Sequence, residues 1–133
     1  MKGLPKKPIL VTGASGYLGG ALLAWLGRLG GNAVGFSRSR DKGFRTYEEL
    51  QTSMSGAEAV VHCAAVTRFF GDPEEITRVN GQWPVELYRE ADEAGVPTFV
   101  FISSIAVHGY WNRPPLTVTE AAPIGARRSR LSD

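Results

Sequence analysis

Three glycines at three-residue spacing, Gly13, Gly16 and Gly19, form the pattern in this sequence best suited to holding a phosphate. A short apolar run precedes them and leucines follow at helical spacing, which predicts a strand, a tight turn and a helix. In such a turn Gly13 permits the bend, Gly16 lets a pyrophosphate approach the backbone, and Gly19 lets the helix pack closely on the strand. The helix N–H groups and its positive dipole end would then face the phosphates. The alternative is a glycine-rich turn that binds nothing.

The residues after the second predicted strand, 33–36, indicate which dinucleotide such a site would take. Positions 37–40 read Ser-Arg-Ser-Arg, with no carboxylate at the strand end to accept hydrogen bonds from a ribose 2′-hydroxyl. Arg38, with Ser37 and Arg40 as candidate helpers, would instead neutralise a 2′-phosphate, because a guanidinium matches phosphate oxygens with two parallel hydrogen bonds. The pattern therefore favours NADP over NAD. A solvated basic loop is the alternative, and Asp41 leaves room for NAD.

Strand and helix patterns alternate along the chain as far as about residue 103. Pro84 lies inside the last predicted helix and should kink or restart it. Alternation of this kind predicts an α/β fold, a Rossmann-type doubly wound parallel sheet with right-handed crossovers, incomplete at its C-terminal side. The dense apolar run of the last strand predicts burial on both of its faces. The expected strands are 8–11, 33–36, 59–62 and 98–103, and the expected helices are 16–29, 46–54 and 72–94. Trp25 falls on the apolar side of the first helix and is expected in the core, and Asp72 is expected to cap the last helix.

The carboxyl ends of parallel strands meet at one edge of a sheet, and ligands of such folds bind there. Gly13, Ala64 and Ser104 each follow a predicted strand, so we expect them to gather at this edge. His62 and Cys63 could be read as a metal or nucleophile pair. The sequence has no second cluster of ligands, so the end of a buried strand is the favoured interpretation. No metal site is predicted.

The composition is that of one globular domain. The chain has 133 residues, of which 43% are apolar and 21% charged, and its net charge of +2 is too small to indicate a nucleic-acid or membrane partner. The one cysteine excludes an internal disulfide and fits a reducing, cytoplasmic location. We expect residues 1–120 to form the nucleotide-binding domain. The arginine-rich residues 121–133 are expected to form an irregular or disordered tail.

Four sequence blocks, in this order, resemble the extended short-chain dehydrogenase/reductases, which form the NAD-dependent epimerase/dehydratase family. The blocks are Thr12-Gly-Ala-Ser-Gly-Tyr-Leu-Gly19, His62-Cys-Ala-Ala65, Val79-Asn80 and Phe99-Val-Phe-Ile-Ser-Ser-Ile-Ala-Val-His-Gly109. They span most of the chain, and they are specific for the superfamily but not for a substrate. The resemblance implies NAD- or NADP-dependent redox chemistry on a nucleotide sugar or a similar hydroxylated small molecule.

The resemblance also implies roles for individual residues. Ser104 matches the family's catalytic serine or threonine, which hydrogen-bonds the reacting hydroxyl or carbonyl, and Tyr110 and Trp111 follow in what would be the substrate loop. Asn80 matches a structural asparagine of the central helix. Ser103 is included in the cofactor site, with a structural role at the strand end as the alternative. The rest of that site comprises Gly13, Ser15, Gly16, Tyr17, Leu18 and Gly19 around the pyrophosphate, and Ala64 and Ala65 beside the ribose and diphosphate.

The sequence departs from the family at its catalytic tyrosine. The family pairs a tyrosine with a lysine four residues later, because the ammonium and the cofactor's positive ring lower the tyrosine pKa toward neutrality. The four tyrosines here, at 17, 47, 88 and 110, are followed at that distance by Ala21, Gln51, Asp92 and Pro114. The family's Gly-Asp-Leu strand, whose acid contacts adenine, is also missing, so the sequence gives little support for a third strand.

The sequence therefore predicts an NAD(P)-binding domain of an epimerase-, dehydratase- or reductase-type oxidoreductase that is inactive alone. Two alternatives stay open. One is a non-catalytic NAD(P)-binding or sensing module, and the other is a truncated or frameshifted fragment without independent function. The sequence does not decide whether the protein forms a homo-oligomer.

Overall fold

The computed structural model describes residues 5–38, 43–67, 72–108, 119–121 and 124. The chain divides into two compact units, Met1–Ile102 and Ser103–Asp133, and each is described here by itself. The predicted boundary at residue 120 falls inside the second unit. Among the described residues, no helix combines the length and the apolar character needed to cross a membrane.

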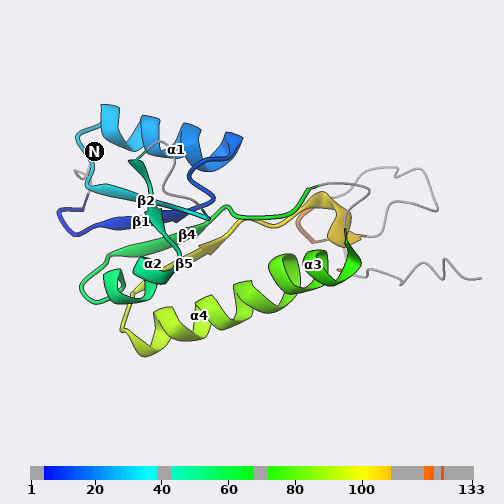
Figure 1. The fold of residues 1–133 in the computed structure, drawn as a ribbon. Coiled ribbons are helices and arrows are strands. Elements are labelled where there is room, and N and C mark those ends of the chain that lie inside the picture. Colours follow the sequence, from blue (N-terminus) through cyan, green and yellow to red (C-terminus); the bar gives the residue numbers. More distant parts are fainter. Residues whose placement is uncertain (1–4, 39–42, 68–71, 109–118, 122–123, 125–133) are drawn as a thin grey trace, which may run out of the picture. The chain divides into compact units, whose positions relative to one another are not determined.

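The first unit is built on a parallel sheet of five strands in the order β3-β2-β1-β4-β5 (Figure 1). β1 lies at the centre, and Thr12 at its carboxyl end is in register with Phe36 of β2 and His62 of β4. This parallel order confirms the predicted α/β architecture. The strands are β1 (Ile9–Thr12), β2 (Ala33–Ser37), β3 (Arg45–Thr46), β4 (Ala59–His62) and β5 (Thr98–Phe101).

The helices cover the two faces of the sheet, α1 on one face and α2 with α4 on the other (Figure 1). Alternate residues of β1 divide between two cores, because successive side chains of a strand point to opposite faces. Leu10 packs with Leu50 and Leu87, whereas Val11 packs with Leu26. The helical elements are α1 (Tyr17–Arg28), α2 (Glu48–Ser53), α3 (Pro73–Thr77), the π-helical turn η2 (Arg78–Gln82) and α4 (Trp83–Glu93).

Local signals account for where the helices begin. The Asp72 side chain accepts a hydrogen bond from the Glu74 amide at 3.0 Å and caps α3, as its position before Pro73 predicts. Pro84 stands in the first turn of α4, which follows the π-helical turn η2 without a break in helical backbone angles. The irregularity therefore lies just before the proline, where the sequence predicts a kink or a restart. A proline is tolerated in a first turn because the first-turn N–H groups have no partner within the helix.

Three sequence-based expectations were wrong or incomplete. Trp25, expected in the core, is 51% exposed on α1. β5 was expected to be buried on both faces, but three of its four residues are exposed, because it is the outer strand of the sheet with only β4 as its neighbour. It ends at Phe101, before the predicted end at residue 103. A third strand does form, but β3 is only two residues long.

The described part of the second unit contains one short 3-10 helix, η3 (Ile105–His108). The Ser104 Oγ accepts a hydrogen bond from the Ala106 amide at 3.2 Å, and the Ser104 carbonyl accepts one from the Val107 amide at 3.1 Å. Ser104 therefore caps the start of this helix, which is the common use of a serine directly before a helix.

Candidate dinucleotide-binding site

The turn between β1 and α1 needs glycine at two of its three glycine positions. Gly13 has a φ of +68°, and a Cβ there would lie 2.8 Å from the backbone of Cys63 and Ala64 at the end of β4. A Cβ at Gly19 would lie 2.3 Å from the Gly13 carbonyl oxygen. These contacts match two of the expected reasons for the glycines, a tight turn at Gly13 and close packing at Gly19.

Gly16 is different, because its own conformation does not require glycine. Its φ of −85° suits any residue, and a Cβ there would meet only the Gly13 carbonyl oxygen, at 3.2 Å. It precedes α1 without a side-chain cap, and the first turn of α1 contains no acidic residue. The surroundings of Gly16 are therefore suited to a close approach by an anionic group to the start of α1.

A polar contact fixes the end of β4 against this turn. The Thr12 Oγ accepts a hydrogen bond from the Ala64 amide at 3.3 Å and lies 2.8 Å from Nδ1 of His62. Because the threonine oxygen accepts the Ala64 hydrogen, its own hydroxyl hydrogen can be donated to the imidazole. These contacts tie Thr12, the last residue of β1, to the end of β4 and to the segment that follows it.

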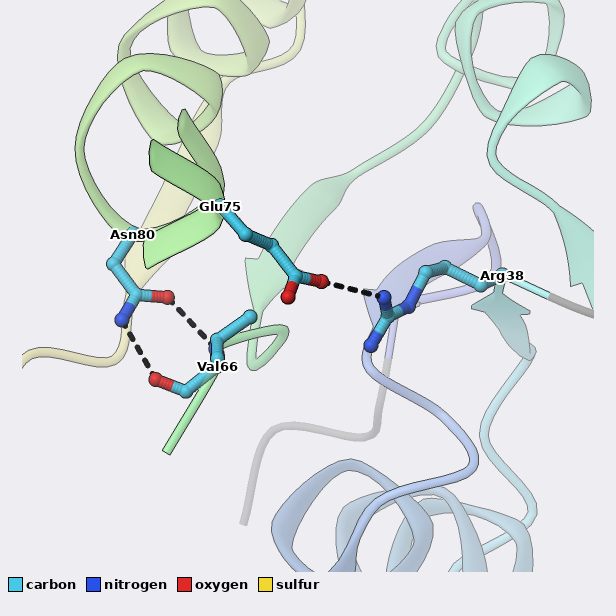
Figure 2. Close-up of polar contacts among 4 residues, drawn as sticks. All are labelled: Arg38, Val66, Glu75 and Asn80. Carbon is cyan, nitrogen blue, oxygen red and sulfur yellow. Dashed lines mark hydrogen bonds and ion pairs between the residues drawn. The ribbon is translucent and has the colours of Figure 1, made fainter. Parts of the chain in front are cut away.

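Asn80 of η2 holds Val66, two residues beyond Ala64, with two hydrogen bonds (Figure 2). Its side-chain oxygen accepts from the Val66 amide and its side-chain nitrogen donates to the Val66 carbonyl, both at 2.8 Å. The amide side chain therefore pairs with the backbone as a neighbouring strand would. This contact gives Asn80 the structural role that the family resemblance implied.

A pocket of about 600 Å³ opens between the glycine turn, the end of β4 and the helical segment η2–α4. It brings together six of the residues predicted to bind the cofactor: Gly13, Ser15, Gly16, Arg38, Ala64 and Ala65. Its other described lining residues are Tyr47, Cys63, Arg78, Val79 and Trp83. The pocket therefore joins backbone, two cations and two aromatic rings in one space.

Four other predicted residues of the first unit are not among those that line the pocket. Tyr17 and Leu18, at the start of α1, are 95% and 47% exposed. Gly19 is buried against the glycine turn, and Ser37 is buried in the core at the end of β2. Ser37 is not among the described residues that line the pocket, and its predicted role beside Arg38 stays a prediction.

Arg38 lies directly after β2 and forms an ion pair with Glu75 of α3, at 3.1 Å between Nη1 and Oε1 (Figure 2). The arginine side chain is largely exposed and the glutamate partly so. Sequence reasoning identified Arg38 but missed Glu75, because the two residues are 37 positions apart. Arg40 and Asp41, the other charged residues considered there, lie outside the described residues.

Tyr47 and Trp83 form an aromatic wall that the sequence did not predict. Their ring centroids are 4.6 Å apart, and the Tyr47 hydroxyl accepts a hydrogen bond from the Gly13 amide at 3.3 Å. Burial raises the pKa of Tyr47, and the Gly13 hydrogen bond and the nearby Arg38 charge lower it by less. The hydroxyl therefore stays protonated near neutral pH. No short-range signal in the sequence links the two residues, which belong to different predicted helices, 46–54 and 72–94.

His62 is a buried core residue at the end of β4. Its side chain is 1% exposed, with the Trp83 ring at 4.9 Å and the Phe101 ring at 5.9 Å between centroids. Burial lowers the His62 pKa to about 4 and raises that of the neighbouring Cys63 thiol, so both are neutral near pH 7. Within the described ranges, no group of three or more His, Cys, Asp or Glu side chains could hold a metal ion.

The remaining predicted residues, Ser103 and Ser104, belong to the second unit. There they line an open pocket of about 530 Å³ that also includes His108, Thr119 and Glu120. The Ser104 hydroxyl already accepts the Ala106 amide, as described above. The tyrosine and tryptophan expected in a substrate loop, at 110 and 111, lie outside the described residues.

Comparison with known proteins agrees with this geometry. Residues 9–129 match the model of the NAD dependent epimerase/dehydratase family. A UDP-glucose 4-epimerase from Vibrio cholerae is 30% identical over an alignment of 119 residues that covers 77% of this chain and 36% of the epimerase. The chain thus spans little more than a third of that relative.

Solved structures show the same fold. A short-chain dehydrogenase/reductase from Agrobacterium tumefaciens with bound NAD is 31% identical, with a TM-score of 0.77 over 89% of this chain and 39% of that one. MoeE5 in complex with UDP-glucose and NAD is 26% identical, with a TM-score of 0.68 over 77% of this chain and 38% of that one. With its parallel sheet, its glycine turn and a family match over most of its length, this chain belongs to the NAD-dependent epimerase/dehydratase family of short-chain dehydrogenase/reductases.

Proposed function

We propose that this chain is the NAD(P)-binding domain of an oxidoreductase that acts on a nucleotide sugar or a similar hydroxylated small molecule. The observation that carries the proposal is the pocket at the carboxyl ends of β1 and β4, which six independently predicted residues line. Ligands of open α/β sheets bind at this edge of the sheet. The related structures with bound NAD, and in one case UDP-glucose, support the same ligand class.

The residues present fit a dinucleotide. Gly13, Ser15 and Gly16 would hold the pyrophosphate at the start of α1, where no acidic side chain in the first turn opposes an anion. Ala64 and Ala65 have small side chains that leave room for a sugar against the backbone. A bound nicotinamide would supply hydride transfer, and this chain would bind and orient it.

The choice between NADP and NAD rests on Arg38. Arg38 lines the pocket and would neutralise a 2′-phosphate, which is why we propose a preference for NADP. NAD is the cofactor bound in the related structures cited above. Measuring the thermal unfolding midpoint at increasing concentrations of NADH and of NADPH tests whether the protein binds a dinucleotide and which of the two it prefers. A bound cofactor should raise the unfolding midpoint as its concentration increases.

A second candidate is a module that binds NAD(P) without turnover. It is favoured by one feature of the sequence given, in which no tyrosine has a lysine four positions later. Ser104 alone would then have no partner that could take a substrate proton. We expect cofactor binding without substrate-dependent NAD(P)H formation by this chain. Turnover that Ser104→Ala abolishes would instead assign catalysis to the chain as it stands.

A further inference from the structure

Glu75 is the one carboxylate paired with a cation of the pocket among the described residues. Its partner Arg38 projects from the end of β2, whereas Glu75 belongs to α3, so the pair joins two elements beside the pocket (Figure 2). Arg38 is also close enough to Tyr47 for its charge to lower the pKa of the hydroxyl that accepts the Gly13 amide. The Arg38 charge therefore acts on the Tyr47 hydroxyl inside the pocket while the Arg38 guanidinium is paired with Glu75.

We propose that Glu75 is a selectivity residue, whose carboxylate competes with a cofactor 2′-phosphate for Arg38 and so lowers the affinity for NADPH relative to NADH. This inference rests on the proposed cofactor-binding function. The selecting carboxylate belongs to α3, so the residues that directly follow β2 do not reveal it.

The charges explain why the two cofactors would respond differently. A 2′-phosphate needs the Arg38 guanidinium, so it must displace or share Glu75, and the carboxylate then lies near a group of the same sign. A ribose 2′-hydroxyl is neutral, and the ion pair can persist beside it. Exposed ion pairs are weak, and the arginine side chain is 68% exposed, so Glu75 would bias the choice without blocking the site.

Glu74 provides a matched control within the same helix. It carries the same charge as Glu75 and is its neighbour in α3, and the contacts described for its side chain include no ion pair with Arg38. Glu74→Gln and Glu75→Gln therefore remove the same charge and keep the same side-chain size. A general electrostatic effect would appear in both variants, whereas competition for Arg38 would appear only in Glu75→Gln.

The test is calorimetric titration of NADH and NADPH into the wild type and both variants. We expect Glu75→Gln to lower the ratio of the NADPH and NADH dissociation constants by about fivefold, and Glu74→Gln to leave it unchanged. In an Arg38→Gln background, Glu75→Gln should no longer change the ratio, because the competed group is gone.

The outcomes separate this inference from the function on which it rests. An unchanged ratio in Glu75→Gln, or an equal change in Glu74→Gln, overturns the role of Glu75 while cofactor binding stands. That role is also overturned if Glu75→Gln weakens both cofactors by the same factor, because the residue is then structural. A wild type that binds neither cofactor overturns the proposed function itself, and the inference with it.

Discussion

β1 and β5 are both short apolar strands with a parallel partner in β4, yet their environments are opposite. All four residues of β1 are buried, and Val11 has no exposed surface. In β5 Val100 is 39% and Phe101 48% exposed. The difference lies in their neighbours, because β1 is flanked by β2 and β4, whereas β5 is the outer strand. Apolar sequence alone therefore identifies a strand without fixing its burial.

The largest effect should come from Gly13, the residue that directly follows the buried strand β1. Gly13→Ala places a Cβ 2.8 Å from the backbone after β4, in a left-handed conformation. We expect a loss of about 3 kcal/mol or more in the free energy of unfolding, measured with urea. Gly27→Ala is the control, because a Cβ there has no neighbour within 4 Å and should stabilise α1 by about 0.5–1 kcal/mol. Equal effects at the two positions would contradict the close approach of the strand ends.

His62 of β4 contacts both strands, because it is hydrogen-bonded to Thr12 of β1 and stacked on Phe101 of β5. Its titration therefore reports on the burial between them. Its pKa is about 4 in the folded protein and about 6.5 when unfolded, so the unfolded state binds more protons between these values. The stability contributed by neutral His62 is complete above pH 6.5 and is lost as the pH falls toward 4, by up to about 3 kcal/mol.

The measurement is the free energy of unfolding as a function of pH from 4 to 8, in the wild type and in His62→Gln. The variant should lack the part of the slope that His62 causes between pH 4 and 6.5. Carboxylates titrate in the same range, but they contribute to both proteins and cancel in the difference. Parallel curves for the two proteins would mean that His62 is not buried as neutral imidazole.

The smallest effect comes from a matched pair of valines. Val11→Ala in β1 removes two buried methyl groups and should cost about 2 kcal/mol, whereas Val100→Ala in β5 should cost less than about 1 kcal/mol. Both variants would be compared by urea unfolding under one condition. Similar losses would show that β5 is covered by a further part of the protein in solution.

Sequence reasoning succeeded where the signal was local. The glycine turn, the strand at 59–62 and the helix cap at Asp72 each depend on residues within a few positions of one another. It failed where burial or contact depends on tertiary packing. Trp25 fits the apolar periodicity of α1 and is nevertheless 51% exposed, and the burial of β5 depends on the order of strands.

The same limit applies to the candidate site. Backbone positions such as Gly13, Gly16 and Ala64 could be predicted because strand ends in a parallel sheet share an edge. Side chains that meet across the pocket could not, because no short-range pattern links Arg38 to Glu75 or Tyr47 to Trp83. The wall of the pocket and the ion pair beside it therefore required the structure.

The central claim is that the glycine turn holds a dinucleotide, and Gly16→Val tests it most directly. The backbone angles of Gly16 suit any residue, and its Cβ would require only a small shift of the Gly13 carbonyl oxygen, 3.2 Å away, so the variant should fold. Its side chain would enter the space that a pyrophosphate needs. Calorimetric titration with NADH and NADPH should show saturable binding to the wild type and at least about tenfold weaker binding to Gly16→Val, at a similar unfolding midpoint. Undiminished affinity in the folded variant, or no binding by the wild type, would contradict the claim.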